Sequence, residues 1–554
     1  MRKFFYLLTS VALTIPQLVS AEKRSVEAMR QAVAEFTCLQ GDGIRKAPAL
    51  GAEPMGIVRE ESQLTILAAD DRFAVIANDD QFDAVLAYSE TPFEQEALSN
   101  PGLRWWLEAM NEALEYHSAH GTRPHKVTVN PNYKASVESF VRAKWNQEEP
   151  YNWQTPTYTE KGKEYHFVTG CVATAMAEAM KHYNYPATGK GTASYRFNTT
   201  TPSGDPITQR VSVNFANGNY EWDKMLDSYS GSYDQGSGNA VAKLMAHCGA
   251  SVKMVYGKDG SSSYLHEAAE ALKSRFLYPE NLHLYQRDYM HVDEWMDIVF
   301  RNLDQGCPIL MRASSKSGGH AFLLDGYTSS GLVSVNWGWG GNGDGYFDMA
   351  SLNGYSSGQQ ILPVVHPEED LPYHSCLAFF SEYAPSYRLN FGALTATGNY
   401  AMNTDYQKFE GVLGLLAQNM ATGQVTELAT NSISLEGYGY DNKYHFTQDC
   451  NFSKVNVSNL QEGTYRIYMA SLSTKESVWQ PVRCHESISN SAILTVAGDK
   501  MSIAEEKSSN WLVGIKAVKV DCPALQGTYN LQGQRVEAPQ RGLYIRNGKK
   551  VVLR

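Results

Sequence analysis

Cysteine is scarce in this sequence, and the cysteines present form none of the patterns of common metal or disulfide sites. Eight are spread over 554 residues, and none belongs to a CxxC pair. This density excludes a disulfide-dense scaffold, and no Cys/His cluster has the spacing of zinc ligands. We therefore expect no metal and no cofactor. One or two disulfides stay open, for example between Cys450 and Cys484, because sequence cannot pair cysteines.

Basic residues are also in deficit. Lys and Arg number 48 against 59 Asp and Glu, which gives a net charge of −11. A general binder of nucleic acid or of anionic membranes needs a basic surface, so this balance argues against both. We expect no nucleic acid among the partners of the protein.

Beyond the N-terminus, the chain lacks any apolar run long enough to span a membrane. At the N-terminus, basic Arg2 and Lys3 precede a short apolar stretch, residues 4–15, and small residues follow at 19–21. This order is typical of a secretory signal peptide, which we expect to be cleaved after about Ala21. The apolar stretch is too short to cross a bilayer comfortably. We expect an exported protein, either secreted or attached to the cell surface, with no membrane span.

What is present begins with a small α+β pattern over residues 22–126. Three short apolar runs separated by Asp and Asn turns lie between 62 and 90, which is typical of a β-meander. Asn100 and Pro101 then predict the N-cap and first residue of a helix. Its apolar stripe, expected to be core, consists of Leu103, Trp106, Leu107, Met110 and Leu114. The polar segment 117–133 predicts an exposed linker, where proteolytic nicking concentrates.

From about residue 385 the sequence changes to alternating strands. The spacing Leu460-x-x-Gly463-x-Tyr465 resembles the tyrosine corner of immunoglobulin-like sandwiches. Near the C-terminus, Asn547-Gly548 separates two strand-like runs and predicts a two-residue hairpin. We expect an Ig-like β-sandwich over 376–500 and a short β module over 515–554.

Cys171 follows a glycine and opens a run rich in alanine and methionine. The apolar spacing predicts a helix from Val172 to Tyr183, which Pro186 ends. A thiol at a helix N-terminus faces unpaired N–H groups and the positive end of the helix dipole, which lowers its pKa. On these residues alone an inert buried thiol is favoured, because free cysteine is among the most buried residue types.

A nucleophilic cysteine needs a base, and the sequence offers His320, which follows two glycines at the start of a predicted strand. Asn336 lies sixteen residues later, a distance that suits a two-stranded hairpin, so we expect its side chain beside His320 to orient the ring. Trp337 would cover that hydrogen bond from water. Gln147 offers a neutral amide as oxyanion donor, although alone it would be interpreted as an ordinary surface glutamine.

Four motifs, in this order, resemble the streptopain family of secreted bacterial cysteine peptidases, a branch of the papain-like fold. They are Trp145-Asn146-Gln147, Gly170-Cys171-Val172-Ala173-Thr174-Ala175, Gly319-His320-Ala321-Phe322 and Asn336-Trp337-Gly338-Trp339-Gly340. The Cys-Gly-Ser-Cys-Trp signature of the papains themselves is absent. The resemblance implies an α+β fold: a two-lobed papain-like peptidase domain over 127–375, preceded by an inhibitory prodomain over 22–126.

The resemblance also implies roles and an activity. Cys171 would be the nucleophile, His320 the general base and acid, Gln147 the oxyanion donor, Asn336 the residue orienting His320, and Trp337 the shield of that pair. Gly318, Gly319 and Trp339, in glycine-rich loops bordering the cleft, would bind substrate. The implied enzyme is a zymogen, silenced by its own prodomain and activated by cleavage in the linker. It would hydrolyse proteins and peptides through a thioester, often with an apolar P2 residue.

Two other functions would use the same scaffold. One is a non-catalytic adhesion or binding protein on a degenerate peptidase domain, which the presence of all four motifs argues against. The other is a transglutaminase-like acyl transferase, in which only the acceptor differs. The last 28 residues resemble C-terminal modules of secreted Bacteroidetes proteins, some of which direct export or surface attachment. A small accessory β module is the simpler interpretation.

Overall fold

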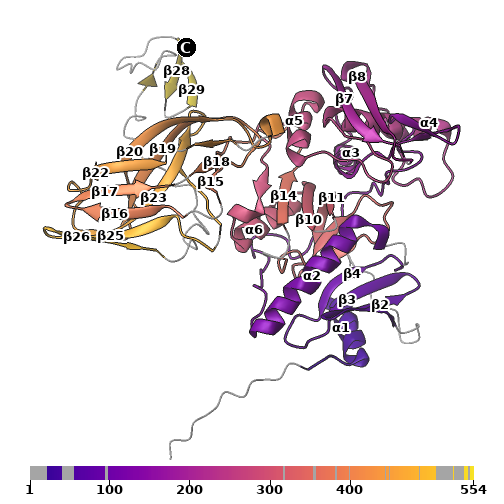
Figure 1. Ribbon diagram of the computed structural model, residues 1–554, viewed down its shortest axis with the longest axis horizontal. Helices are drawn as coiled ribbons and strands as arrows, with labels where there is room; N and C mark the ends of the chain where they lie inside the picture. The colour runs from indigo at the N-terminus through magenta and orange to yellow at the C-terminus, as the bar shows by residue number, and fades with distance from the viewer. Residues whose placement is uncertain are drawn as a thin grey trace, which may run out of the picture.

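The computed structural model describes most of the chain after the predicted signal peptide (Figure 1). It covers residues 22–39, 55–93, 98–201, 203–315, 318–352, 357–380, 384–398, 400–442, 445–447, 450–485 and 487–506, with the strand residues 528–529, 542–546 and 549–553. The predicted signal peptide, 1–21, lies outside these residues. Within the described ranges, none of the helices combines the length and apolar character that crossing a membrane requires.

A ten-stranded antiparallel sheet runs through the first two thirds of the chain, in the order β1-β2-β3-β4-β13-β12-β11-β10-β14-β9. Its N-terminal strands are β1 (Gly56–Glu60), β2 (Leu64–Ala69), β3 (Arg72–Ala77) and β4 (Val85–Ser89). The others are β9 (Tyr285–Gln286), β10 (Ile309–Ser315), β11 (Gly318–Tyr327), β12 (Val333–Asn336), β13 (Gly345–Phe347) and β14 (Ser357–Pro363). Strands β2 to β4 confirm the predicted meander.

The meander is joined to the rest of the ten-stranded sheet through β4. Strand β4 pairs with β13, with Tyr88 opposite Tyr346 and Ala87 opposite Phe347. Tyr88, Ala87 and Phe347 are buried, so the join lies within a core. Residues 56–89 therefore extend the sheet that carries His320.

Two helices pack on this N-terminal part, α1 (Val26–Leu39) and α2 (Pro101–His120). The Asn100 side chain accepts hydrogen bonds from the N–H groups of Gly102 and Leu103, which confirms the predicted N-cap. Gly121 ends α2 in the left-handed conformation at φ 61°. The predicted stripe of α2 is buried in the core that also contains β10 and β11, so this helix covers one face of these strands (Figure 1).

The other face of the sheet carries a helical lobe. Its elements are α3 (Cys171–Tyr183), α4 (Gln235–Ser251) and α5 (Leu265–Phe276), with the hairpins β5 (Thr157–Glu160), β6 (Lys163–His166), β7 (Thr192–Thr200) and β8 (Pro206–Asn214). Helix α6 (Val292–Asp304) lies with α2 on the opposite side. Alternate residues of β11 serve the two cores: Ala321 and Leu323 face α3, and Phe322 faces α2. This is the expected α+β, two-lobed papain-like architecture.

The C-terminal part is a β-sandwich. One sheet has the order β20-β19-β23-β25-β26, with β24 on β23, and it packs over the sheets β16-β17-β22 and β15-β18-β21. The strands are β15 (Leu377–Phe379), β16 (Ser386–Asn390), β17 (Ala393–Thr397), β18 (Ala401–Asn403), β19 (Phe409–Asn419), β20 (Val425–Leu435), β21 (Phe446–Thr447), β22 (Asn451–Asn456), β23 (Gly463–Ser473), β24 (Gln480–Pro481), β25 (Ser491–Ala497) and β26 (Lys500–Glu505). The sandwich thus runs five residues beyond the predicted boundary at 500, because β25 and β26 form a hairpin.

The structure tests two predictions for this part, the tyrosine corner at Tyr465 and the possible disulfide between Cys450 and Cys484. The Tyr465 hydroxyl donates to the Gln461 carbonyl at 3.0 Å, which confirms the tyrosine corner. Cys450 and Cys484 are not joined to each other, since each sulfur donates to a main-chain carbonyl, of Thr447 and Ile488. Past the sandwich, β28 (Gly542–Arg546) pairs with β29 (Lys549–Leu553) and with β27 (Thr528–Tyr529). The Asn547-Gly548 pair itself lies outside the described residues.

The sandwich is fastened by polar contacts to α6 and to the segment that contains β9. Arg483 makes two hydrogen bonds with the Glu294 carboxylate on α6, each 2.5 Å long. Asp405 lies 3.1 Å from His283 Nδ1, and the Gln286 amide donates to the Thr404 carbonyl at 2.7 Å. These residues are largely buried, so the contacts fix how the sandwich sits on the lobe of α6.

Candidate active site

Cys171 is the first residue of α3 and is partly buried. Gly170 precedes it at φ 89°, a conformation that side chains rarely adopt. A Cβ at Gly170 would lie 2.8 Å from the Met254 side chain and 3.0 Å from Ser261 Cβ. Glycine is therefore required here by both conformation and packing, and it sets the thiol at the start of the helix.

The surroundings of Cys171 favour the thiolate. Burial raises the pKa of the Cys171 thiol, but a hydrogen bond from His320 and its charge act in the other direction. The N–H groups of Ala321 and Val172 add to this lowering of the pKa. The net result is a pKa below the ordinary thiol value, as a nucleophile at neutral pH requires.

His320 lies near the start of β11 and is 3% exposed. Its Nε2 is 2.8 Å from the carbonyl oxygen of Trp337. A carbonyl can only accept, so Nε2 carries the proton in the neutral ring, and Nδ1 is the nitrogen left to exchange a proton with the thiol. The ring therefore has the tautomer that a base for Cys171 needs.

The expectation that the Asn336 side chain lies beside His320 and accepts directly from its ring is wrong. The predicted hairpin forms, but Asn336 pairs with Leu323, three residues beyond His320, and an odd separation turns the two side chains to opposite faces of the sheet. The Asn336 Nδ2 instead donates to the Ala143 carbonyl at 2.8 Å and to Glu178 Oε1 at 3.3 Å. The ring of His320 is held by the main-chain carbonyl of Trp337, the residue after Asn336.

The expected role of Trp337 changes with this. Its indole cannot shield an Asn–His hydrogen bond that is absent; it is fully buried against Phe322 and Phe347, with ring centroids at 4.8 and 5.1 Å. The main chain of Trp337 supplies the carbonyl that His320 uses. The ring of Trp339 lies edge-on to His320, with centroids 6.0 Å apart.

Gln147 is placed close to the cysteine by its main chain. Its carbonyl accepts from the N–H of Thr169 at 3.0 Å, two residues before Cys171. Residue 147 is 7% exposed, which removes the interpretation as a surface glutamine. Two residues earlier, the main chain of Trp145 donates to Glu178 at 2.8 Å and accepts from Gly340 at 2.7 Å.

The two glycines before His320 form the exposed end of β11. Gly319 pairs with Ser314 and Gly318 with Ser315, and Gly318 has φ 134°. Both glycines are exposed, so they leave the edge beside His320 uncovered. Among the described residues, no three His, Cys, Asp or Glu side chains are grouped as ligands for a metal ion.

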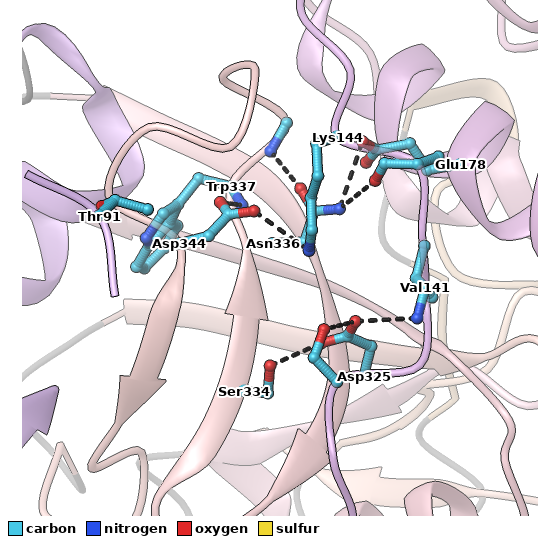
Figure 2. Close-up of polar contacts among 12 residues, drawn as sticks. Thr91, Val141, Lys144, Glu178, Asp325, Ser334, Asn336, Trp337 and Asp344 are labelled. Carbon is cyan, nitrogen blue, oxygen red and sulfur yellow. Dashed lines mark hydrogen bonds and ion pairs between the residues drawn. The ribbon is translucent and has the colours of Figure 1, made fainter. Parts of the chain in front are cut away.

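Beneath the Trp337 turn lies a polar cluster that the sequence motifs did not indicate (Figure 2). The Trp337 N–H donates to Asp344 Oδ1 at 2.9 Å, and Lys144 Nζ lies 3.3 Å from Asp344 Oδ2. Burial raises the pKa of the Asp344 carboxyl, while Lys144 lowers it. The available signal was Glu178, a carboxylate within the small and apolar residues of α3, seven residues after Cys171.

Helix α2 reaches the site from the N-terminal part. A Cβ on Gly102 would lie 2.7 Å from His320 Cδ2 and would also strike the Trp337 ring. The first turn of α2 is therefore in direct contact with both residues. The Ser89 hydroxyl donates to the Asp344 carbonyl, and the Gly343 N–H donates to Thr91, so the N-terminal part also holds the loop after Trp337.

Comparison with known proteins gives a consistent set of relatives. The model of the peptidase C10 family matches residues 145–347. Streptopain from Streptococcus pyogenes is 32% identical over 297 residues, which are 51% of this chain and 72% of streptopain. The thiol protease/hemagglutinin PrtT of Porphyromonas gingivalis is 25% identical over 401 residues, 66% of this chain and 44% of PrtT. The structure of a prointerpain A fragment from Prevotella intermedia covers 57% of this chain and 99% of its own, with 34% identity and a TM-score of 0.50.

Proposed function

Because this chain belongs to the peptidase C10 family, and so to the cysteine peptidases, we propose that it is an exported endopeptidase, made as a zymogen, whose nucleophile is Cys171. The observation that carries the proposal is the pairing of Cys171, the first residue of α3, with His320 at the start of β11, where His320 lowers the pKa of the thiol below its ordinary value. Thiolate and base meet at the start of a helix, beside an exposed glycine edge.

The chemistry follows from the pair. The Cys171 thiolate attacks the peptide carbonyl, and the carbonyl π electrons move to the oxygen. The His320 imidazolium gives its Nδ1 proton to the amine as the C–N bond breaks, which leaves a thioester. His320 then takes a proton from a water molecule whose oxygen attacks the thioester carbonyl. The C–S bond breaks with its electrons on sulfur, which releases the carboxylic acid and restores the Cys171 thiolate beside the imidazolium. The Trp337 carbonyl holds Nε2–H throughout and stabilises the imidazolium.

The oxyanion needs donors, and two are at hand in the proposed reaction. The N–H of Cys171 belongs to the first turn of α3, where it has no partner within the helix. Gln147, one of the family motif residues, would supply the second from its side-chain amide, consistent with its tie to Thr169. Gly318, Gly319 and Trp339, around His320, would line the cleft and bind the substrate main chain.

Residues 22–126 would act as the inhibitory prodomain. This is supported by the contact of Gly102 with His320 and Trp337, by the β4–β13 pairing, and by the relation to prointerpain A. With α2 in place, the face of His320 on that side is closed. Cleavage in the segment after His120, which is largely exposed, would begin activation.

Gly102→Leu is expected to shorten the half-time of self-processing about tenfold. An added side chain cannot fit against His320 and Trp337, so it weakens the docking of α2, and overpacking of this kind costs about 1–3 kcal/mol. Conversion is followed on gels at fixed protein concentration, with Glu112→Leu on the exposed face of α2 as the control. Once the severed N-terminal piece has been removed, the matured enzymes should have equal kcat, because they no longer carry the substituted helix. An unchanged half-time would contradict the inhibitory contact.

Export and the C-terminal parts complete the proposal. The N-terminal signal pattern would direct secretion, and the sandwich and the last β module would serve attachment or export, with the enzyme secreted or bound at the cell surface. A chain in which the last 28 residues are deleted would separate these roles. Retention of peptidase activity with loss of surface attachment is the expected result.

The function is tested with wild-type protein, residues 22–554. We expect it to cut itself between about 115 and 135, to hydrolyse casein, and to lose both activities on alkylation of Cys171 by iodoacetamide, located by mass spectrometry. A chain that neither matures nor cleaves casein would refute the proposal. Transfer of the acyl group to an added amine in preference to water would instead support the acyl transferase.

A further inference from the structure

The amide of Asn336 acts on the same peptide unit that orients His320. The Trp337 carbonyl, which accepts from His320 Nε2, and the Gly338 N–H belong to one peptide group. That N–H donates to Asn336 Oδ1 at 3.0 Å. A peptide group that donates at one end is a better acceptor at the other, because hydrogen bonds in a chain polarise one another. Asn336 thus reaches His320 through one peptide group.

The direction of the Asn336 amide is fixed from its other end. Nδ2 donates to the Ala143 carbonyl and to Glu178 Oε1, and all of Asn336 is buried (Figure 2). A flipped amide would place its NH₂ group against the Gly338 N–H, two donors facing each other. The two acceptors beside Nδ2 therefore decide that Oδ1 faces the Trp337–Gly338 peptide.

Glu178 joins this arrangement to two other segments. It lies on α3, two turns after Cys171, and is completely buried. Its Oε1 accepts from the Trp145 N–H at 2.8 Å as well as from Asn336, and its Oε2 has no hydrogen-bond partner within the described residues. One carboxyl therefore connects the helix of Cys171, the segment leading to Gln147 and the turn that holds His320.

We propose that Glu178 is a positioning residue, which orients His320 through the Asn336 amide and the Trp337–Gly338 peptide. The proposal rests on the proposed function in that His320 is taken as the base for Cys171. Glu178 touches neither the thiol nor the substrate edge. Its contribution is to hold the imidazole where it pairs with the thiolate, at a site where a small misplacement is costly.

Glu178 can accept the hydrogen bond from Asn336 without being ionised. Burial raises the pKa of its carboxyl well above the ordinary value, and Asp344 adds to this, whereas Lys144 and the hydrogen bonds from Trp145 and Asn336 lower it. A neutral carboxyl keeps the Oε1 acceptor, and so does the amide of glutamine. Glu178→Gln should therefore preserve the arrangement, while Glu178→Leu removes it at similar volume.

The test measures the reactivity of Cys171 in the full chain, residues 22–554, which does not depend on peptide hydrolysis. Iodoacetamide labelling of the Cys171 peptide is timed by mass spectrometry between about pH 5 and pH 9. In Glu178→Leu we expect the midpoint of the rate profile to rise by about one pH unit, a tenfold slower reaction at pH 6. Glu178→Gln should stay within about twofold of wild type.

Asp325→Leu is the matched control. Asp325 is another buried carboxylate of this region, held by Ser139, Val141 and Ser334, but it makes no hydrogen bond to the Trp337 turn (Figure 2). Its replacement should lower the melting temperature and leave the labelling profile unchanged. In matured Glu178→Leu, kcat should fall about tenfold or more with KM within about twofold, since the substrate edge is untouched.

Two results would overturn the proposal. One is a wild-type labelling profile in folded Glu178→Leu. The other is a wild-type profile in Asn336→Ala, which breaks the same connection from β12 and decides the question even if Glu178→Leu does not fold. The double variant should shift no further than Asn336→Ala alone, because the two residues act in series. A wild type that labels as described but hydrolyses no protein would refute the proposed function and leave this positioning role standing.

Discussion

A chain carrying Cys171→Ala is expected to stay at full length under conditions in which wild type matures completely. Without the thiolate there is no acyl-enzyme, and the remaining site can only bind and polarise the substrate. The loss of casein hydrolysis should be about 10⁴-fold or more. Gel analysis over several wild-type half-times measures the first effect, and a fluorescent casein assay of prodomain-free protein measures the second.

Two controls make this result specific. Cys38→Ala removes an exposed thiol from α1 and should mature like wild type. Added mature wild-type enzyme should cut Cys171→Ala in the segment after His120, which would show that the variant is folded and its linker accessible. Maturation of Cys171→Ala at the wild-type rate without any added enzyme would mean that another group or a contaminating peptidase makes the cut.

The second large effect concerns the base. His320→Ala is expected to reduce kcat/KM about 10³-fold to 10⁴-fold and to move the alkylation profile of Cys171 upward. Burial raises the pKa of this thiol, and His320 lowers it. Without the imidazole, only the N–H groups of Ala321 and Val172 would still oppose the effect of burial. The thiolate would then form only at higher pH, and alkylation at pH 6 should slow at least tenfold.

His166→Ala serves as the comparison, since His166 Nδ1 bonds to the Thr155 carbonyl and lies outside the site. It should leave both the alkylation profile and kcat/KM within about twofold of wild type. An unshifted profile in His320→Ala would show that the thiol owes its low pKa to the helix start alone. In that case His320 would have to act only after acylation.

Much of this arrangement was open to prediction because it is local. The start of α2 is specified within four consecutive residues, from Asn100 to Leu103. Gly170, before Cys171, has a positive φ that residues with a side chain rarely adopt. The tyrosine corner likewise depends on a spacing of a few residues. In each case the residues that form the sequence pattern and the structure that they determine lie within one turn or one strand. The pattern alone is therefore enough to predict the local structure.

The sequence did not predict the register of the β11–β12 hairpin, and it did not predict contacts between residues far apart in the chain. Sixteen residues separate His320 from Asn336 and predict a hairpin, yet a hairpin of that length does not say which residues stand opposite each other. The pairing of Asn336 with Leu323 decided that question. Glu178 contacts Trp145, 33 residues away, and Asn336, 158 residues away, contacts that no local pattern announces.

The shared sheet has a consequence for the time course of activation. Cutting the chain after α2 breaks one peptide bond but none of the hydrogen bonds between β4 and β13, nor the buried contacts of Tyr88 and Phe347. The severed N-terminal piece would stay in place as a bound ligand, so scission and release are separate events. At high protein concentration the complex of the cut enzyme with its N-terminal piece should persist. Peptidase activity would then appear only when the piece is released by dilution or is degraded.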